Sequence, residues 1–157
     1  MSIEITGLET IQKSLNTLSQ SLGKTEMKST MTTIGNMITN TIEESFEREQ
    51  SPWGEKWREL DPKTKKQKQR KGKSNLILRS SGDLADEWQV TASSESVEVS
   101  SNAKSEKEFA YGAVHQWGSK KVAARKFLPI SESGELEPKL QKQIEGYLDS
   151  KIEQAIK

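Results

Sequence analysis

The chain has 157 residues, enough for one domain with a short extension, and 31% of them are hydrophobic while 30% are charged. Globular domains usually carry roughly 45–50% apolar residues, so we expect a modest core that leaves segments exposed or relies on neighbouring subunits for cover. The formal net charge is +1 and cysteine is absent. Disulfide frameworks and thiolate metal sites are therefore excluded, and the distribution of charge carries more information than its total.

The sequence also argues against membrane insertion and secretion. Residues 1–5 lack a basic segment followed by an apolar run, so no secretory signal is visible. No stretch approaches the roughly 20 apolar residues that a membrane span needs. We expect a protein that is soluble and intracellular when made.

The first 50 residues predict a short strand and two helices. Ile3 and Ile5 alternate with Glu4, which is typical of a strand. Two apolar stripes at spacings of three and four then predict a helix ending at Gly23 and a longer helix running to about Gln50. The stripes consist of Leu8, Ile11, Leu15, Leu18 and Leu22, and of Met27, Met31, Ile34, Ile38, Ile42 and Phe46.

A compact aromatic turn follows, with Trp53 and Trp57 four residues apart. Gly54 between them favours a turn or an irregular packed loop over a helix. Three interpretations of the pair are open: core packing, which is the default, a protein–protein interface, or a ligand platform. In a chain with so few apolar residues, the interface is nearly as good an interpretation as the core.

The sharpest electrostatic feature is a basic run that contains no acid. Asp61 and Pro62 predict a helix start, as N-cap and first helical residue. Almost nothing apolar ties the following residues to a core, so we expect a mobile basic loop or a frayed helix at about residues 62–75. Its cations suit phosphate or an acidic partner, and the alternative is a solvated loop. They are Lys63, Lys65, Lys66, Lys68, Arg70, Lys71 and Lys73.

The remaining residues predict a small antiparallel sheet and a final helix. The expected elements are a return to the core at 76–78, a turn at 80–84, a hairpin of 88–90 with 97–99, a short helix at 109–116 closed by Gly118, a strand-like return at 126–130, and a helix on which residues 136, 140, 144, 148, 152 and 156 form the apolar stripe. The fold class is α+β, a single domain over 1–157 with long amphipathic helices packed on a small, mostly antiparallel sheet.

His115 is the obvious catalytic suspect, because it is the only histidine in the chain. General-base catalysis needs an orienting partner and a nucleophile or metal nearby. The chain has no second histidine, no cysteine and no Gly-x-Ser-x-Gly elbow. We therefore interpret His115 as a structural histidine whose ring bonds to a backbone carbonyl between packed aromatic residues. A small hydrolase or nuclease centred on His115 is the weakest alternative.

Acidic pairs supply no convincing metal site. The acidic groups are Glu43 with Glu44, Asp83 with Asp86 and Glu87, and Glu106 with Glu108. None has Asp-x-Asp spacing or a phosphate-binding loop beside it. We predict no catalytic residue, no metal and no cofactor.

An ordered set of landmarks resembles the phage virion morphogenesis family, the tail-completion proteins of contractile-tailed phages and Mu-like prophages. Pro52-x-Gly54-x-x-Trp57 is similar to the family's Gly-x-x-Trp turn, and Ile77-Leu78-x-x-x-Gly82-x-Leu84 to its Ile-Leu-x-x-x-Gly-x-Leu. The more specific pair is Tyr111 to Gly118, which resembles Tyr-Ala-x-x-His-Gln-aromatic-Gly, and Ala124 to Leu128, which resembles Ala-Arg-x-Phe-Leu. Gly112 departs from the usual alanine, and Ala123 from a frequent proline.

The resemblance implies a non-enzymatic role in finishing the tail or the head–tail junction. The partners it implies are other phage tail or head–tail connector proteins and further copies of the chain in a ring. Non-specific DNA contact is possible, and no membrane contact is expected. Its expected location is the bacterial host cytoplasm during assembly and then the virion. The motif pair would form a structural corner of Tyr111, His115, Trp117, Gly118, Arg125 and Phe127. A sequence-independent nucleic-acid-binding protein that uses the basic run is the alternative.

Overall fold

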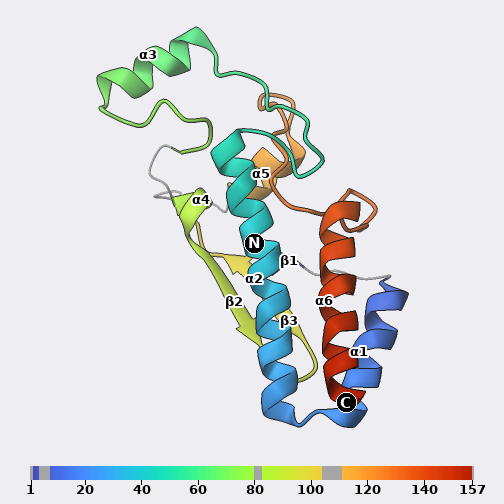
Figure 1. Cartoon of the computed structure of the whole chain (residues 1–157). Helices are drawn as coiled ribbons and strands as arrows, with labels where there is room; N and C mark the ends of the chain where they lie inside the picture. The colour runs from blue at the N-terminus through green and yellow to red at the C-terminus, as the bar shows by residue number, and fades with distance from the viewer. Residues whose placement is uncertain (1, 4–7, 80–82, 104–110, 157) are drawn as a thin grey trace. The chain divides into compact units, whose positions relative to one another are not determined.

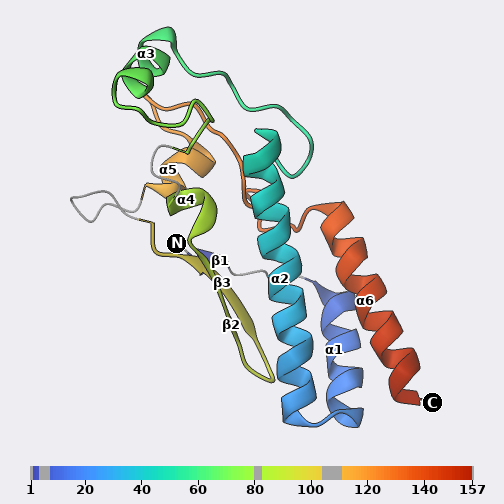
Figure 2. The ribbon, with the colours of Figure 1, turned by 60° about the vertical axis from the view of Figure 1, so that its left-hand side comes forward.

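The computed structural model describes residues 2–3, 8–79, 83–103 and 111–156. Its elements are β1 (Ser2–Ile3), α1 (Glu9–Ser21), α2 (Lys24–Arg48), α3 (Pro62–Arg70), α4 (Asp83–Asp86), β2 (Trp88–Ala92), β3 (Val97–Ser101), α5 (Gly112–Trp117) and α6 (Pro138–Ile156) (Figures 1 and 2). The strands form one sheet in the order β1-β3-β2. The predicted α+β class, with long helices and a small, mostly antiparallel sheet, is confirmed.

Two compact units make up the chain. The α1–α6 unit comprises Ile3–Asn40, Val90–Val99 and Pro129–Lys157. The corner unit comprises Met1–Ser2, Thr41–Gln89 and Ser100–Leu128. The organisation as a single domain stays a prediction. Among the described residues, no helix is long and apolar enough to span a membrane.

In the α1–α6 unit, the first and last helices pack against each other along their apolar stripes (Figure 1). Ile11 and Leu18 of α1 are buried. The buried residues of α6 are Leu140, Ile144 and Leu148, which confirms the predicted spacing of four. Because i, i+4 positions share a helix face, these three residues form one stripe, whereas the predicted stripe residues Ile152 and Ile156 are half-buried and 77% exposed.

Helix α6 begins two residues later than its apolar pattern indicates. Leu136 is buried and forms an isolated bridge with Ile130. The carboxylate of Glu137 then accepts hydrogen bonds from the backbone N–H groups of Lys139 (2.9 Å) and Leu140 (2.7 Å). These bonds satisfy donors that have no partner within a helix, so Glu137 defines the start of α6.

Helix α2 lies close to the hairpin at Gly35. Met31, Ile34 and Ile38 on the same helix are buried. A Cβ atom added to Gly35 would clash with Cγ1 of Val90 and lie 2.8 Å from Cγ2 of Val97. Only glycine permits this close approach between the helix backbone and the two strands.

The core of the corner unit is a cluster of aromatic rings. Phe46, near the end of α2, lies edge-on to Trp57 with ring centroids 5.4 Å apart, and 5.1 Å from Phe127. Trp88 of β2 lies 6.0 Å from Phe127. Phe46 and Phe127 have no exposed surface. The Phe46–Trp57 and Trp88–Phe127 pairs are edge-to-face, and such pairs add to the free energy gained from area burial alone.

The structure corrects two local predictions and confirms the start of a third element. Helix α2 ends at Arg48 rather than Gln50, because Glu49 adopts a positive φ of 51° and Gln50 forms a bridge with Lys56. The strand-like return at 126–130 is not a strand; Ile130 alone forms an isolated bridge. The basic run contains the nine-residue helix α3, with Asp61 as N-cap and Pro62 first, as predicted.

Some predictions fall on residues that lie outside the described part of the chain. They are the strand beyond Ile3, most of the turn at 80–84, the beginning of the helix predicted from Phe109, and the pair Glu106 and Glu108. The mobility of residues 62–75 stays a prediction.

The approach at Gly35 predicts opposite effects for two glycine substitutions in helices. Gly35→Ala should lower the free energy of unfolding by about 1–2 kcal/mol, because overpacking outweighs the gain in helix propensity. Gly146→Ala in α6 is the matched control, since nothing lies within 4 Å of its added Cβ, and it should raise stability by about 0.5–1 kcal/mol. Thermal unfolding measures both, and equal effects would contradict the close approach.

Candidate functional site

The corner is held together by the side chain of Gln116. This residue has no exposed surface, and its Oε1 accepts hydrogen bonds from the backbone N–H groups of Phe127 (2.8 Å) and Leu128 (2.9 Å). The backbone N–H of Arg125 also donates to the carbonyl of His115 at 2.7 Å. These bonds join α5 to the segment at 125–128, and they explain why this segment does not pair as a strand.

Gly118 ends α5, as predicted, and closes the turn that follows. Its backbone has φ +80°, a conformation that L side chains rarely adopt. A Cβ at this position would lie 3.0 Å from the backbone N of Ala124. The two halves of the motif pair are therefore brought together by a glycine-dependent turn and by the Gln116 amide.

The predicted corner residues differ in exposure. Phe127 is in the aromatic core and Arg125 is buried, whereas Tyr111 and His115 are half-buried. Trp117 is exposed at 37%. Gln116, which was not singled out as a site residue, makes the contacts that define the corner. Its position inside the His-Gln-aromatic-Gly motif was the available signal.

His115 packs edge-on against Tyr111, with ring centroids 5.9 Å apart. Its Nδ1 atom is buried and has no hydrogen-bond partner within the described residues, so the predicted bond from the ring to a carbonyl is not made at this nitrogen. Burial of the ring, followed by the nearby charge of Arg125, lowers its pKa below the ordinary value of 6.5. A buried cationic form is disfavoured in such surroundings.

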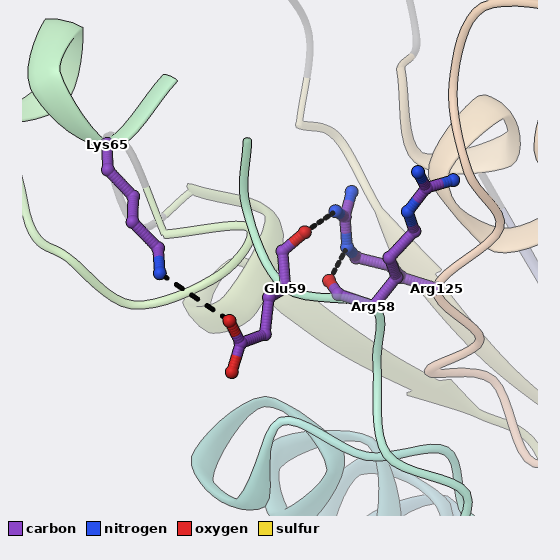
Figure 3. Close-up of polar contacts among 4 residues, drawn as sticks. All are labelled: Arg58, Glu59, Lys65 and Arg125. Atoms are coloured by element: carbon purple, nitrogen blue, oxygen red, sulfur yellow. Dashed lines mark hydrogen bonds and ion pairs between the residues drawn. The ribbon is translucent and has the colours of Figure 1, made fainter. Parts of the chain in front are cut away.

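Arg125 links the corner to the chain that precedes α3. Its Nε donates to the carbonyl of Arg58 (2.8 Å), and a terminal guanidinium nitrogen donates to the carbonyl of Glu59 (3.3 Å). Figure 3 shows the guanidinium group aimed at both oxygens, with Lys65 reaching the Glu59 carboxylate separately. Burial, and then the charge of Arg58, lowers the pKa of Arg125.

The two tryptophans of the 53–57 turn have different environments. Trp57 is buried, and its indole N–H donates to the carbonyl of Lys126 at 2.7 Å. Trp53 is exposed at 39%. The core interpretation therefore holds for Trp57. A subunit interface stays a prediction, and Trp53 is exposed enough to contribute to it.

The cations of the basic run separate into one buried lysine and six exposed side chains. Lys68 is 7% exposed, and its Nζ donates to the carbonyl of Leu76 at 2.6 Å. Burial is the main cause that lowers its pKa; Glu49 acts in the opposite direction and Lys73 adds to the lowering. Glu49 also accepts the backbone N–H of Ile77 at 2.7 Å. The exposed cations are Lys63, Lys65, Lys66, Arg70, Lys71 and Lys73.

A cavity of about 770 Å³ lies between these parts of the corner unit. Its walls are residues 58–62, one side of α3, and the corner with the turn at 121–123. His115, Lys68 and Arg125 all line it. The sequence predicted neither the cavity nor the convergence of these residues, because it is created by contacts between segments about 60 residues apart.

Metal chemistry has no assembled ligand set in the described part of the chain. No three side chains of histidine, aspartate or glutamate gather there as metal ligands would. The predicted lack of a metal or cofactor stays a prediction, because Glu106 and Glu108 lie outside the described residues.

The two bonds to Gln116 predict a large cost for removing their acceptor. Gln116→Leu should lower the free energy of unfolding by about 2–4 kcal/mol, because each buried donor left without a partner costs about 1–3 kcal/mol. Gln116→Glu keeps an acceptor for both N–H groups and should retain more stability at a pH where the carboxyl is neutral. Chemical denaturation measures both variants. Equal losses for both at low pH would contradict a role based on acceptance.

The lowered pKa of His115 predicts a pH-dependent stability with a defined sign. The unfolded chain binds a proton near pH 6.5 and the folded chain only at lower pH, so the stability contributed by His115 is complete above 6.5 and is lost as pH falls. The melting temperature should therefore decrease just below pH 6.5. His115→Phe should flatten this decrease, since no other histidine titrates. An unchanged slope would contradict the assignment.

The comparisons with known proteins agree with the landmarks in the corner. The family model described as the phage virion morphogenesis family matches residues 6–152. No curated protein and no solved structure matches the chain. The matched range contains the turn with Trp53 and Trp57, helix α3, and both halves of the motif pair at 111–118 and 124–128. The chain belongs to the phage virion morphogenesis family.

Proposed function

We propose that the protein completes the phage tail, or the junction between head and tail, as a non-enzymatic structural component. Membership of the phage virion morphogenesis family supports an assembly role. The observation that carries the structural interpretation is the use of the Gln116 side chain. In the most specific motif of the chain, the buried acceptor atom Oε1 of Gln116 fixes the motif's own backbone at Phe127 and Leu128, as a structural element would.

The environment of His115 supports the same proposal. Within the described residues its Nδ1 has no hydrogen-bond partner, and the charge of Arg125 acts on the ring. A cation beside the ring opposes the imidazolium form that a general base must reach. This arrangement favours a packed, neutral histidine over a catalytic one.

We further propose that the protein acts as a ring of identical subunits among other tail or head–tail connector proteins. With 31% hydrophobic residues, the chain has little apolar surface to spare, yet Trp53 and Leu76 remain 39% and 44% exposed. Contact with a neighbouring subunit would cover them. Assembly would take place in the cytoplasm of the bacterial host, and the protein would then remain in the virion.

Deletion of the gene from the phage or prophage that encodes it tests the role. Electron microscopy should show filled heads and separate tails that fail to join, and the wild-type gene should restore complete particles. Trp53→Ala should restore far fewer particles than wild type while its melting temperature stays within about 2 °C, because an exposed side chain contributes little to monomer stability. Complete particles in the deletion strain would overturn the proposal.

The alternative function is sequence-independent binding of nucleic acid through the basic helix. The exposed cations of α3 favour it, since lysines that neutralise phosphates release counterions without reading sequence. This function requires affinity for free DNA that falls steeply with salt, and it involves all exposed cations of the helix rather than one side.

A further inference from the structure

The cavity of the corner unit has an unusual balance of charge. Six cationic side chains line it, whereas its carboxylates are those of Glu59 and Asp61. Glu59 already forms an ion pair with Lys65 at 3.7 Å, and Lys65 is not part of the lining. The lining cations are Arg58, Lys68, Lys71, Lys73, Lys121 and Arg125. The cavity therefore carries an excess of positive charge although the chain as a whole is nearly neutral.

Two of these cations are almost completely buried and form no ion pair within the described residues, although the charge of Glu49 acts on Lys68. Lys68 is 7% exposed and Arg125 is 9% exposed. Both donate hydrogen bonds to backbone carbonyls, and neither forms an ion pair within the described residues. Holding a buried charge without an opposite charge is costly. An anionic group bound in the cavity would relieve this cost.

The remaining lining indicates which kind of anion fits. Leu60, Leu78, Leu84 and Val122 place apolar side chains in the same cavity, together with Tyr111. Its volume of about 770 Å³ is in the range of sites that enclose a small ligand or a few residues of a peptide. Phosphates on a duplex require only an exposed basic surface, whereas a short acidic protein segment uses both the cations and the apolar wall.

We propose that this cavity binds a short acidic segment of a partner protein, with its carboxylates at Lys68, Lys71 and Lys73 and an apolar side chain against the leucines. The segment would enter from a neighbouring subunit of the particle. The inference rests on the proposed function only for the identity of the protein that carries the segment. Binding itself depends on the cavity alone.

Helix α3 provides a matched control, because its lysines lie on two sides. Lys68 lines the cavity together with Thr64 and Gln67, and Lys71 and Lys73 beyond the helix also line it. Lys63 and Lys66 are exposed and do not line it. Two charge reversals on either side change the net charge of the protein equally.

The test uses the purified full-length protein and the fluorescein-labelled peptide acetyl-Glu-Glu-Leu-Glu-Glu-amide, followed by fluorescence anisotropy. The double variant Lys71→Glu with Lys73→Glu should bind the peptide at least about tenfold more weakly than wild type, since like charges are opposed at the site. Lys63→Glu with Lys66→Glu should stay within about threefold. A peptide with glutamine in place of glutamate should not bind.

The single histidine locates the peptide independently of these variants. His115 lines the cavity, so the NMR signals of its ring should shift as the acidic peptide is added to the wild-type protein. If the Lys71→Glu, Lys73→Glu variant loses binding but its free His115 ring signal matches that of the wild-type protein, the variant is still folded.

Three outcomes would overturn the inference. They are the absence of peptide binding to the wild-type protein up to the solubility of the peptide, binding that leaves the His115 signals unmoved, and equal weakening by both double variants. If the wild-type protein binds a labelled DNA duplex but not the peptide, and both double variants weaken DNA binding equally, nucleic acid is favoured as the partner instead. If the deletion strain still makes complete particles, the assembly role is overturned, whereas the result for peptide binding is unaffected.

Discussion

The corner unit depends on one buried amide. The Oε1 atom of Gln116 receives the N–H groups of Phe127 and Leu128, so a side chain does at this place what a neighbouring strand does in a sheet. Buried backbone donors must find partners, and here a single acceptor satisfies two of them. The position of Phe127 in the aromatic cluster, beside Phe46 and Trp88, follows from that constraint.

Hydrogen bonds to backbone carbonyls connect the Gln116 corner to the segment that precedes α3. Trp57 donates to Lys126, and Arg125 donates to Arg58 and Glu59. Asp61 and Pro62 then start α3. The wall of the cavity and the first turn of α3 are therefore attached to the corner at fixed points, and Lys68 is attached again through the carbonyl of Leu76. The family motif thus fixes the charged cavity next to it.

Sequence periodicity predicted the elements whose structure depends on local spacing. The stripes of α1, α2 and α6 and the hairpin were recoverable from it, and the capping signal of Asp61 and Pro62 separately predicted the start of α3. The prediction of a strand at 126–130 was wrong. The alternation of its residues does not reveal that a glutamine side chain accepts the hydrogen bonds of its backbone N–H groups. The burial of Lys68 was equally invisible, since a lysine in a basic run is ordinarily solvated and its acceptor at Leu76 comes from tertiary structure.

The four tryptophans fall into two pairs with different access to water. The indole N–H groups of Trp57 and Trp88 donate to backbone carbonyls of Lys126 and Leu84, whereas Trp53 and Trp117 are each more than a third exposed. Intrinsic fluorescence therefore contains a component that a quencher reaches and one that it does not. Incorporation into a particle that covers Trp53 would remove part of the accessible component, so the unlabelled protein carries its own optical record of assembly.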